Sequence, residues 1–194
     1  IDIQIIDGND EAAIIASTDL KQLISDNKVF LYVDVGGGST EFTVFANGKN
    51  IVSHSFKLGT VRIINGMVED VTWQQAKNWV TQHTKAYSKI NVIGSGGNIN
   101  SIYRFSENKI GQPLSYLFMS SFYEKVKQYD YNQRVFELKM NPDRADVIIP
   151  ATRIYLSAMK WAKAKNMYVP KIGLADGIVT VSYTHLTLPT MVQV

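Results

Sequence analysis

The stretch DVGGGSTE, residues 34–41, decides the fold that we expect for the chain. It ends an apolar run at residues 29–35, which predicts a buried strand. Alternating residues at 41–46 predict a second strand, and the pair Asn47-Gly48 after it is a strong signal for a two-residue hairpin turn. With a third strand expected at residues 51–58, the segment is predicted to form a three-stranded antiparallel meander.

The periodicity changes after the meander, where apolar residues recur at helical spacing. Helices are expected at residues 72–87, from the glycine loop at 94–98 toward Phe105, from Ser121 onward and at residues 143–165, with short strands at 91–93 and 171–174. Thr72 and Ser121 are the expected N-caps, and Pro150 predicts a kink or a break in the last helix. A meander followed by alternating helices and strands predicts an α/β domain with a mixed sheet flanked by helices.

Length and composition limit the function classes that the chain can belong to. The 194 residues correspond to one medium domain or two small ones, and 45% are hydrophobic, which is enough for a substantial core. The absence of cysteine excludes disulfides and thiolate metal sites and fits a cytoplasmic location. The net charge of +3 suits an anionic ligand. No run of Lys and Arg indicates a nucleic-acid polymer, and no apolar run has the length needed to span a membrane.

The glycine run is a candidate phosphate site because converging backbone N–H groups bind phosphate and usually need φ values that only glycine tolerates cheaply. The candidate phosphate-binding residues of this first loop are Gly36, Gly37, Gly38, Ser39 and Thr40. Asp34 at the strand end could hold magnesium, and Glu41 re-enters the next strand toward the same cleft or into the sheet. The alternative is a flexible hairpin that binds nothing.

A second glycine-rich loop follows the strand expected at residues 91–93 and precedes a helix, so its N–H groups and the helix N-terminus favour an anion. Its candidate phosphate-binding residues are Gly94, Ser95, Gly96, Gly97 and Asn98. Neither loop has the Gly-Lys-Ser/Thr ending of a P-loop, and the second lacks the G-x-G-x-x-G spacing of a dinucleotide site. Two such loops at successive strand ends indicate a phosphate cleft more strongly than either alone.

Together these stretches resemble the exopolyphosphatase and guanosine pentaphosphate phosphohydrolase family, part of the actin, sugar kinase and heat-shock chaperone ATPase superfamily. DVGGGSTE is close to a signature of that family, and the loop at residues 94–98 agrees with it. The opening segment IIDGNDEA, residues 5–12, resembles the segment that carries the family's catalytic glutamate, which makes Glu11 the candidate here. Arg144-Ala145-Asp146 resembles another family block, and the resemblance covers about residues 1–180.

The resemblance implies a ribonuclease-H-like sheet and an enzyme of two related domains with the cleft between them. We expect this chain to be the second domain with a hinge element, so that one wall of the cleft is absent. The expected divisions are a hinge strand and helix at residues 1–25, a phosphate-binding domain at 26–181 and a tail of uncertain origin at 182–194. Ala175-Asp176-Gly177 stands where the family often has Arg-Glu-Gly.

The implied reaction is magnesium-dependent hydrolysis of the terminal phosphoanhydride bond of inorganic polyphosphate. Glu11 would orient or deprotonate the attacking water, and Asp34 and Glu41 would hold Mg2+. Guanosine pentaphosphate is the alternative substrate. A nucleotide-binding module that switches conformation, and a domain that binds phosphate without catalysis, are the alternatives from other classes. A homodimer is one of the assembly states left open.

Several of these residues also have plainer interpretations. Glu11 could be an ordinary first-turn glutamate, favoured by the helix dipole. Arg62 could reach a phosphate or merely cover the sheet edge, and Arg144 with Asp146 could form an ordinary ion pair. The three histidines share no metal-ligand spacing, so we expect them to be structural or solvent-facing. Trp79 lies on the apolar stripe of its helix, so we expect it to pack in the core and not to stack on a ligand.

Overall fold

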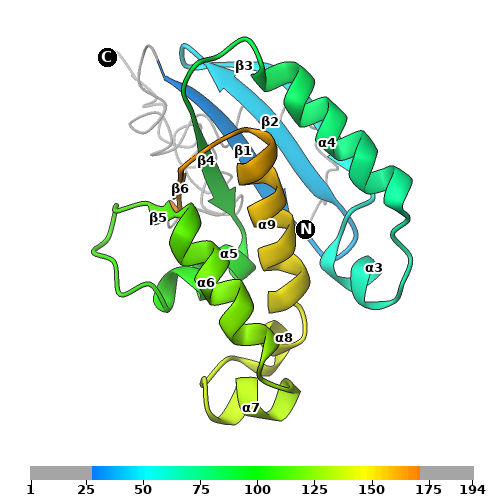
Figure 1. Cartoon of the computed structure of the whole chain (residues 1–194), viewed down its shortest axis with the longest axis vertical. Coiled ribbons are helices and arrows are strands. Elements are labelled where there is room, and N and C mark those ends of the chain that lie inside the picture. Colours follow the sequence, from blue (N-terminus) through cyan, green and yellow to red (C-terminus); the bar gives the residue numbers. More distant parts are fainter. Residues whose placement is uncertain (1–27, 171–194) are drawn as a thin grey trace, which may run out of the picture.

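The computed structural model describes residues 28–170 and forms a twisted sheet with helices packed across it (Figure 1). Glu11, the strand expected at residues 171–174 and the tail at 182–194 lie outside the described residues, as do both expected domain boundaries. Predictions about them stay predictions.

The antiparallel meander is confirmed. It consists of β1 (Val29–Val35), β2 (Thr40–Ala46) and β3 (Lys49–Phe56), paired in chain order. The turn between β2 and β3 is formed by Asn47 and Gly48, with φ values of 52° and 73°. Two successive residues with positive φ are what a type I′ hairpin requires, so the Asn-Gly signal gave the correct turn.

Three further strands complete a six-stranded mixed sheet in the order β3-β2-β1-β4-β6-β5. β4 (Ile90–Ser95) runs parallel to β1, and β6 (Asn166–Tyr168) runs parallel to β4. β5 (Leu114–Ser115) is antiparallel to β6. The predicted fold class is thereby confirmed, although β5 and β6 are too short to produce a recognisable pattern in the sequence.

The described helices are α3 (Thr60–Ile64), α4 (Asp70–Thr84), α5 (Gly97–Arg104), α6 (Tyr116–Lys127), α7 (Tyr131–Phe136), α8 (Pro142–Ala145) and α9 (Ile148–Trp161). Both predicted N-caps were wrong. α4 begins before Thr72, with Glu69 at the N-cap, and α6 is capped by Ser115, whose hydroxyl accepts from the N–H of Phe118 at 3.1 Å.

The long helix expected at residues 143–165 is two helices, and Pro150 does not cause the break. The interruption lies at residues 146–147, between α8 and α9. Pro150 is the third residue of α9, in the first turn, where its missing N–H would have had no intrahelical acceptor.

Residues on the two faces of the sheet alternate along β1. Leu31, Val33 and Val35 join the main core, which α4, α5, α6 and α9 cover, and α9 lies across the middle of the sheet in Figure 1. Phe30 and Tyr32 face the other way, into a smaller cluster to which no described helix contributes. Asp34 follows Tyr32 by two residues, so it belongs to this second face.

Candidate functional site

A row of polar side chains crosses four neighbouring strands on the second face of the sheet. Asp34 on β1 is paired in register with Glu41 on β2 and with Ser95 on β4, and Glu41 is paired with Ser55 on β3. Residues paired in this way point to the same side of a sheet. β1 and β4 are parallel, so the row lies where their carboxyl ends meet and where both predicted loops begin. The structure thus brings the two loops and the two carboxylates together.

The glycine run forms the tight turn between β1 and β2. The N–H of Gly36 donates to the carbonyl of Ser39 at 2.9 Å and closes the hairpin. The carbonyls of the run are held from outside by residues 60–62. The N–H of Thr60 donates to Gly36 O at 3.0 Å, the N–H of Val61 donates to Gly37 O at 3.0 Å, and Arg62 Nε donates to Gly38 O at 2.9 Å.

This arrangement fixes where the N–H groups of the turn point. In a planar trans peptide the C=O and the following N–H point in opposite directions. Since three successive carbonyls point toward α3, the N–H groups of Gly37, Gly38 and Ser39 point away from it. None of these three donates a hydrogen bond to another residue in 28–170. Converging N–H groups of this kind form an anion-binding concavity.

The reason for glycine in the run differs from the one expected. None of Gly36, Gly37 and Gly38 has a left-handed φ, so the premise that the turn needs glycine-only backbone angles was wrong. The close approach occurs instead at Gly59, the residue before α3. A Cβ on Gly59 would lie 2.2 Å from Gly37 O. Residues 59–62, whose hydrogen bonds to the loop carbonyls act as a clamp, can therefore approach the loop only because residue 59, outside the motif, is glycine.

In the second loop the expected dependence on glycine backbone angles does hold. Gly96 has a φ of 98°, which L side chains rarely adopt, and it is the N-cap of α5. A Cβ there would lie 3.2 Å from Asp34 Oδ1, so the loop comes directly against the carboxylate of β1. A Cβ on Gly94 would lie 2.9 Å from Met167 Sδ, which shows how closely β6 packs.

Tyr155 on α9 supports the second loop from the main core, on the helix-covered face of the sheet. Its hydroxyl donates to the carbonyl of Ser95 at 2.6 Å, and the side chain is completely buried. Burial raises the pKa of Tyr155 well above its usual 10.0, and the nearby charge of Asp34 raises the pKa further. The phenol therefore stays protonated and remains a donor to the loop.

The other predicted phosphate ligands differ in their surroundings. Thr40 is buried and donates its hydroxyl to the carbonyl of Leu58, so the structure gives that hydroxyl a structural role in place of the expected phosphate contact. Ser39 donates its hydroxyl to Glu41 Oε1 at 3.1 Å. Asn98, the second residue of α5, is buried with no hydrogen-bond partner for Oδ1 among the described residues. Such an orphan group is a place where a bound molecule can supply a partner.

Asp34 and Glu41 are the two carboxylates of the row that could hold a magnesium ion. Glu41 uses one oxygen, Oε1, to accept from the hydroxyls of Ser39 at 3.1 Å and Ser55 at 3.3 Å. Within residues 28–170, no group of three or more His, Asp or Glu side chains is arranged to hold a metal ion. Mg2+ in phosphoryl-transfer sites is commonly bound through one or two carboxylates, waters and substrate phosphates. The two carboxylates match that kind of site.

A cleft of 450 Å³ adjoins the second loop at Gly97. It is lined by Gly97, Asn100, Ser101, Tyr103, Arg104, Asn141, Arg144 and Val169. A Cβ on Gly97 would lie 2.8 Å from Arg144 Nη2, so the guanidinium packs directly on the first residue of α5. Arg144 forms its ion pair with Asp143, at 3.4 Å, and not with Asp146 as the alternative interpretation supposed.

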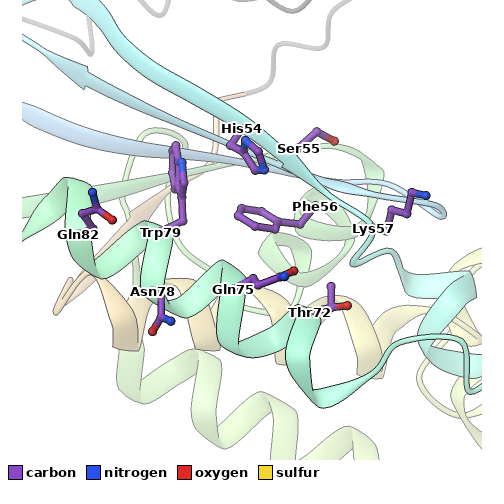
Figure 2. Close-up of a pocket in the computed structure, with 9 residues that line it drawn as sticks. All are labelled: His54, Ser55, Phe56, Lys57, Thr72, Gln75, Asn78, Trp79 and Gln82. Atoms are coloured by element: carbon purple, nitrogen blue, oxygen red, sulfur yellow. The ribbon is translucent and has the colours of Figure 1, made fainter.

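A second hollow, of 580 Å³, lies between the edge strand β3 and α4 (Figure 2). Its aromatic side chains, His54, Phe56 and Trp79, contact one another, with ring centroids 4.5 to 6.2 Å apart. Amide side chains of α4, among them Gln75 and Asn78, line the other wall. This agrees with the expectations that Trp79 packs against the core and that His54 is structural or solvent-facing, since His54 is exposed.

No helix within residues 28–170 combines the length and apolar character needed to cross a membrane.

Comparisons with known proteins agree with this geometry. The model of the Ppx/GppA phosphatase family matches residues 1–185. Among solved structures, a Ppx/GppA family member from Aquifex aeolicus superposes with a TM-score of 0.74 at 18% identity, covering 97% of this chain and 67% of that one. An exopolyphosphatase from Cytophaga hutchinsonii gives 0.75 at 20% identity, with coverages of 95% and 66%.

A second Aquifex aeolicus structure, a type II variant, gives a TM-score of 0.66 at 20% identity, with coverages of 87% and 60%. The chain thus spans 60% to 67% of the length of these structures. At such identities the likeness establishes the fold. No curated protein matches the chain.

Proposed function

Because the chain belongs to the Ppx/GppA phosphatase family, we propose that it takes part in hydrolysing the terminal phosphoanhydride bond of inorganic polyphosphate. The chain spans about two thirds of the structures that it resembles. The complete reaction is therefore proposed for the full-length enzyme.

The observation that carries this proposal is the meeting of two N–H-rich loops with Asp34 and Glu41 at one edge of the sheet. Asp34 lies in register with both Glu41 and Ser95, and a Cβ on Gly96 would nearly touch Asp34 Oδ1. Phosphoryl transfer asks little covalent chemistry of the protein and depends on positioning and charge neutralisation. A site built from N–H donors and two carboxylates suits those requirements.

In the proposed reaction each group has one task. The N–H groups of Gly37, Gly38 and Ser39 would bind phosphate oxygens on one side, and the N-terminus of α5 would bind them on the other. Magnesium, when held by Asp34 and Glu41, would neutralise phosphate charge. Glu11 would orient the attacking water or accept its proton, a role that rests on the motif alone.

Guanosine pentaphosphate is the second candidate substrate, and the cleft beside Gly97 supports it. That cleft lies next to the second phosphate loop, has a volume of 450 Å³ and includes the side chains of Arg104 and Arg144. It offers room and positive charge for a group larger than one phosphate. The two substrates share the terminal phosphoanhydride chemistry and differ in what the cleft would hold.

The test is phosphate release from long-chain polyphosphate and from guanosine pentaphosphate by the full-length enzyme, with and without Mg2+. Glu11→Gln is expected to lower turnover by at least about a hundredfold, the scale of a general acid–base contribution, while polyphosphate binding persists. Turnover that survives this change would remove Glu11 from the mechanism. A preparation that binds neither substrate at all would overturn the phosphatase proposal itself.

A further inference from the structure

Two side chains within residues 28–170 donate hydrogen bonds to the carbonyls of the glycine run: Thr60 Oγ1 to Gly36 O at 3.4 Å, and Arg62 Nε to Gly38 O. The first backbone N–H groups of α3 already donate to the carbonyls of Gly36 and Gly37. Thr60 N donates to Gly36 O at 3.0 Å, and Val61 N and Arg62 N donate to Gly37 O at 3.0 and 3.3 Å. The carbonyl of Gly38 is left to a side chain, and Arg62 Nε meets it at 2.9 Å.

The peptide between Gly38 and Ser39 has its orientation set by this bond. Its carbonyl points to the guanidinium, so its N–H, which belongs to Ser39, points to the opposite side. α3 packs on the main core through Ile63, on the helix-covered face of the sheet. The opposite side is therefore the face that carries Asp34 and Glu41.

We propose that Arg62 is a positioning residue for phosphate recognition, which acts through the Gly38–Ser39 peptide and does not itself contact the anion. The inference rests on the proposed function, in that the loop must bind phosphate. It replaces both earlier interpretations of Arg62, direct phosphate contact and cover of the sheet edge. A guanidinium suits the task because it is planar, permanently charged and forms strong hydrogen bonds to carbonyl oxygens.

The inference predicts an effect on one N–H and not on its neighbours. Removing the donor at residue 62 frees the Gly38 carbonyl, so the N–H of Ser39 loses its fixed direction. The N–H of Gly37 belongs to the peptide whose carbonyl Thr60 holds, and that bond remains. A general loss of structure, or of a direct contact between Arg62 and phosphate, would not single out Ser39.

The experiment compares Arg62→Met, which keeps a long stem without a donor, with Arg62→Lys, which restores a charged donor. The full chain is labelled with 15N and titrated with tripolyphosphate, following the backbone signals of Gly37, Gly38 and Ser39. Arg62→Met should weaken binding by roughly three- to tenfold, the equivalent of one hydrogen bond, and abolish the shift of the Ser39 signal. Arg62→Lys should recover most of both.

Lys57→Met is the matched control, because it removes one positive charge five residues earlier from a side chain that lines the hollow between β3 and α4. Binding by Arg62→Met equal to that of the unchanged chain would overturn the positioning role alone. An equal loss of the Gly37 and Ser39 responses, or an equal loss in Lys57→Met, would also overturn it, in favour of unfolding or of general charge. No response of any of the three signals in the unchanged chain would overturn phosphate binding by the loop, and this inference with it.

Discussion

Replacing Gly59 with alanine tests whether the phosphate loop depends on the clamp formed by residues 59–62. Gly59 has φ −109° and ψ 159°, an extended conformation that alanine adopts freely, so backbone strain is not the reason to expect an effect. The new Cβ would lie 2.2 Å from Gly37 O and 2.4 Å from Gly37 C. Cβ atoms essentially never approach another atom within 3.0 Å, so residue 59 and the Gly37 peptide must move apart by at least 0.8 Å, which disturbs the clamp and the loop together.

A displacement of that size is enough to break hydrogen bonds to a bound anion. N–H···O bonds have donor–acceptor distances of about 2.7–3.2 Å, and a further 0.8 Å carries most of them beyond bonding range. Loss of one or two such bonds to a charged phosphate would weaken binding by roughly 10- to 1000-fold. Overpacking should cost about 1–3 kcal/mol of folding stability.

The measurements are calorimetric titration of the full chain with tripolyphosphate and thermal unfolding followed by circular dichroism. Ile64→Ala is the control, since Ile64 is an exposed residue of the same helix and holds no loop carbonyl. If Gly59→Ala bound tripolyphosphate as tightly as the unchanged chain, the loop would not owe its binding geometry to the clamp.

Three other substitutions test the second loop and the carboxylates. Gly96→Ala should cost about 1–3 kcal/mol of stability and weaken tripolyphosphate binding, because φ is 98° and the Cβ would meet Asp34; unchanged unfolding would contradict the assigned backbone. Tyr155→Phe removes the buried hydroxyl donor to Ser95 O, at a cost of about 1–3 kcal/mol at neutral pH. Folding raises the Tyr155 pKa above 10.0, so the stability that the neutral phenol contributes is complete below pH 10 and is lost as the pH rises further. The Phe variant should therefore lose less stability than the unchanged chain between neutral and strongly alkaline pH. Equal losses in the two proteins would show that Tyr155 does not cause this pH dependence. Glu41→Gln keeps the shape but removes one charge, so the tightening of tripolyphosphate binding by Mg2+ should shrink severalfold, and a tightening of undiminished size would exclude Glu41 as a magnesium ligand.

The meander and its first turn were predictable because their signals are local. An apolar run, a glycine run and an Asn-Gly pair each act over a few residues, and the register of β1 with β2 follows from the short turn. The motif also led to the expectation that Asp34 and both glycine loops line one cleft, with Glu41 directed toward it or into the sheet, and the structure brings these residues close together. The pairing of β1 with β2 in a hairpin and the parallel pairing of β4 with β1 are enough to bring these residues together, so no long-range side-chain contact had to be predicted.

Capping was predicted less well because tertiary context decides between competing signals. Ser121 and Glu124 have capping-box spacing, yet α6 already begins at Tyr116 and is capped by Ser115. The strand pairing of β5 brings Ser115 to that position, and β5 itself is only two residues long. A strand of two residues is too short to be detected from the spacing of residue types in the sequence.

The supporting residues of the site could not be found from sequence patterns. Arg62 reaches Gly38 across 24 residues, and Tyr155 reaches Ser95 across 60. Nothing local marks either residue as a hydrogen-bond donor to a loop carbonyl. Gly59 is similar, since its requirement arises from the packing of α3 against Gly37 and not from its own turn.

The same two spans imply an order in which the halves of the site form during folding. The first loop and its clamp lie within one continuous segment of the chain, so they can close with the meander at a small cost in loop entropy. The hydrogen bond from Tyr155 to Ser95 O, in contrast, can form only when α9 has docked, 60 residues further along the chain. Amide hydrogen exchange at the second loop should therefore report the docking of α9, whereas exchange within the meander should report its own opening.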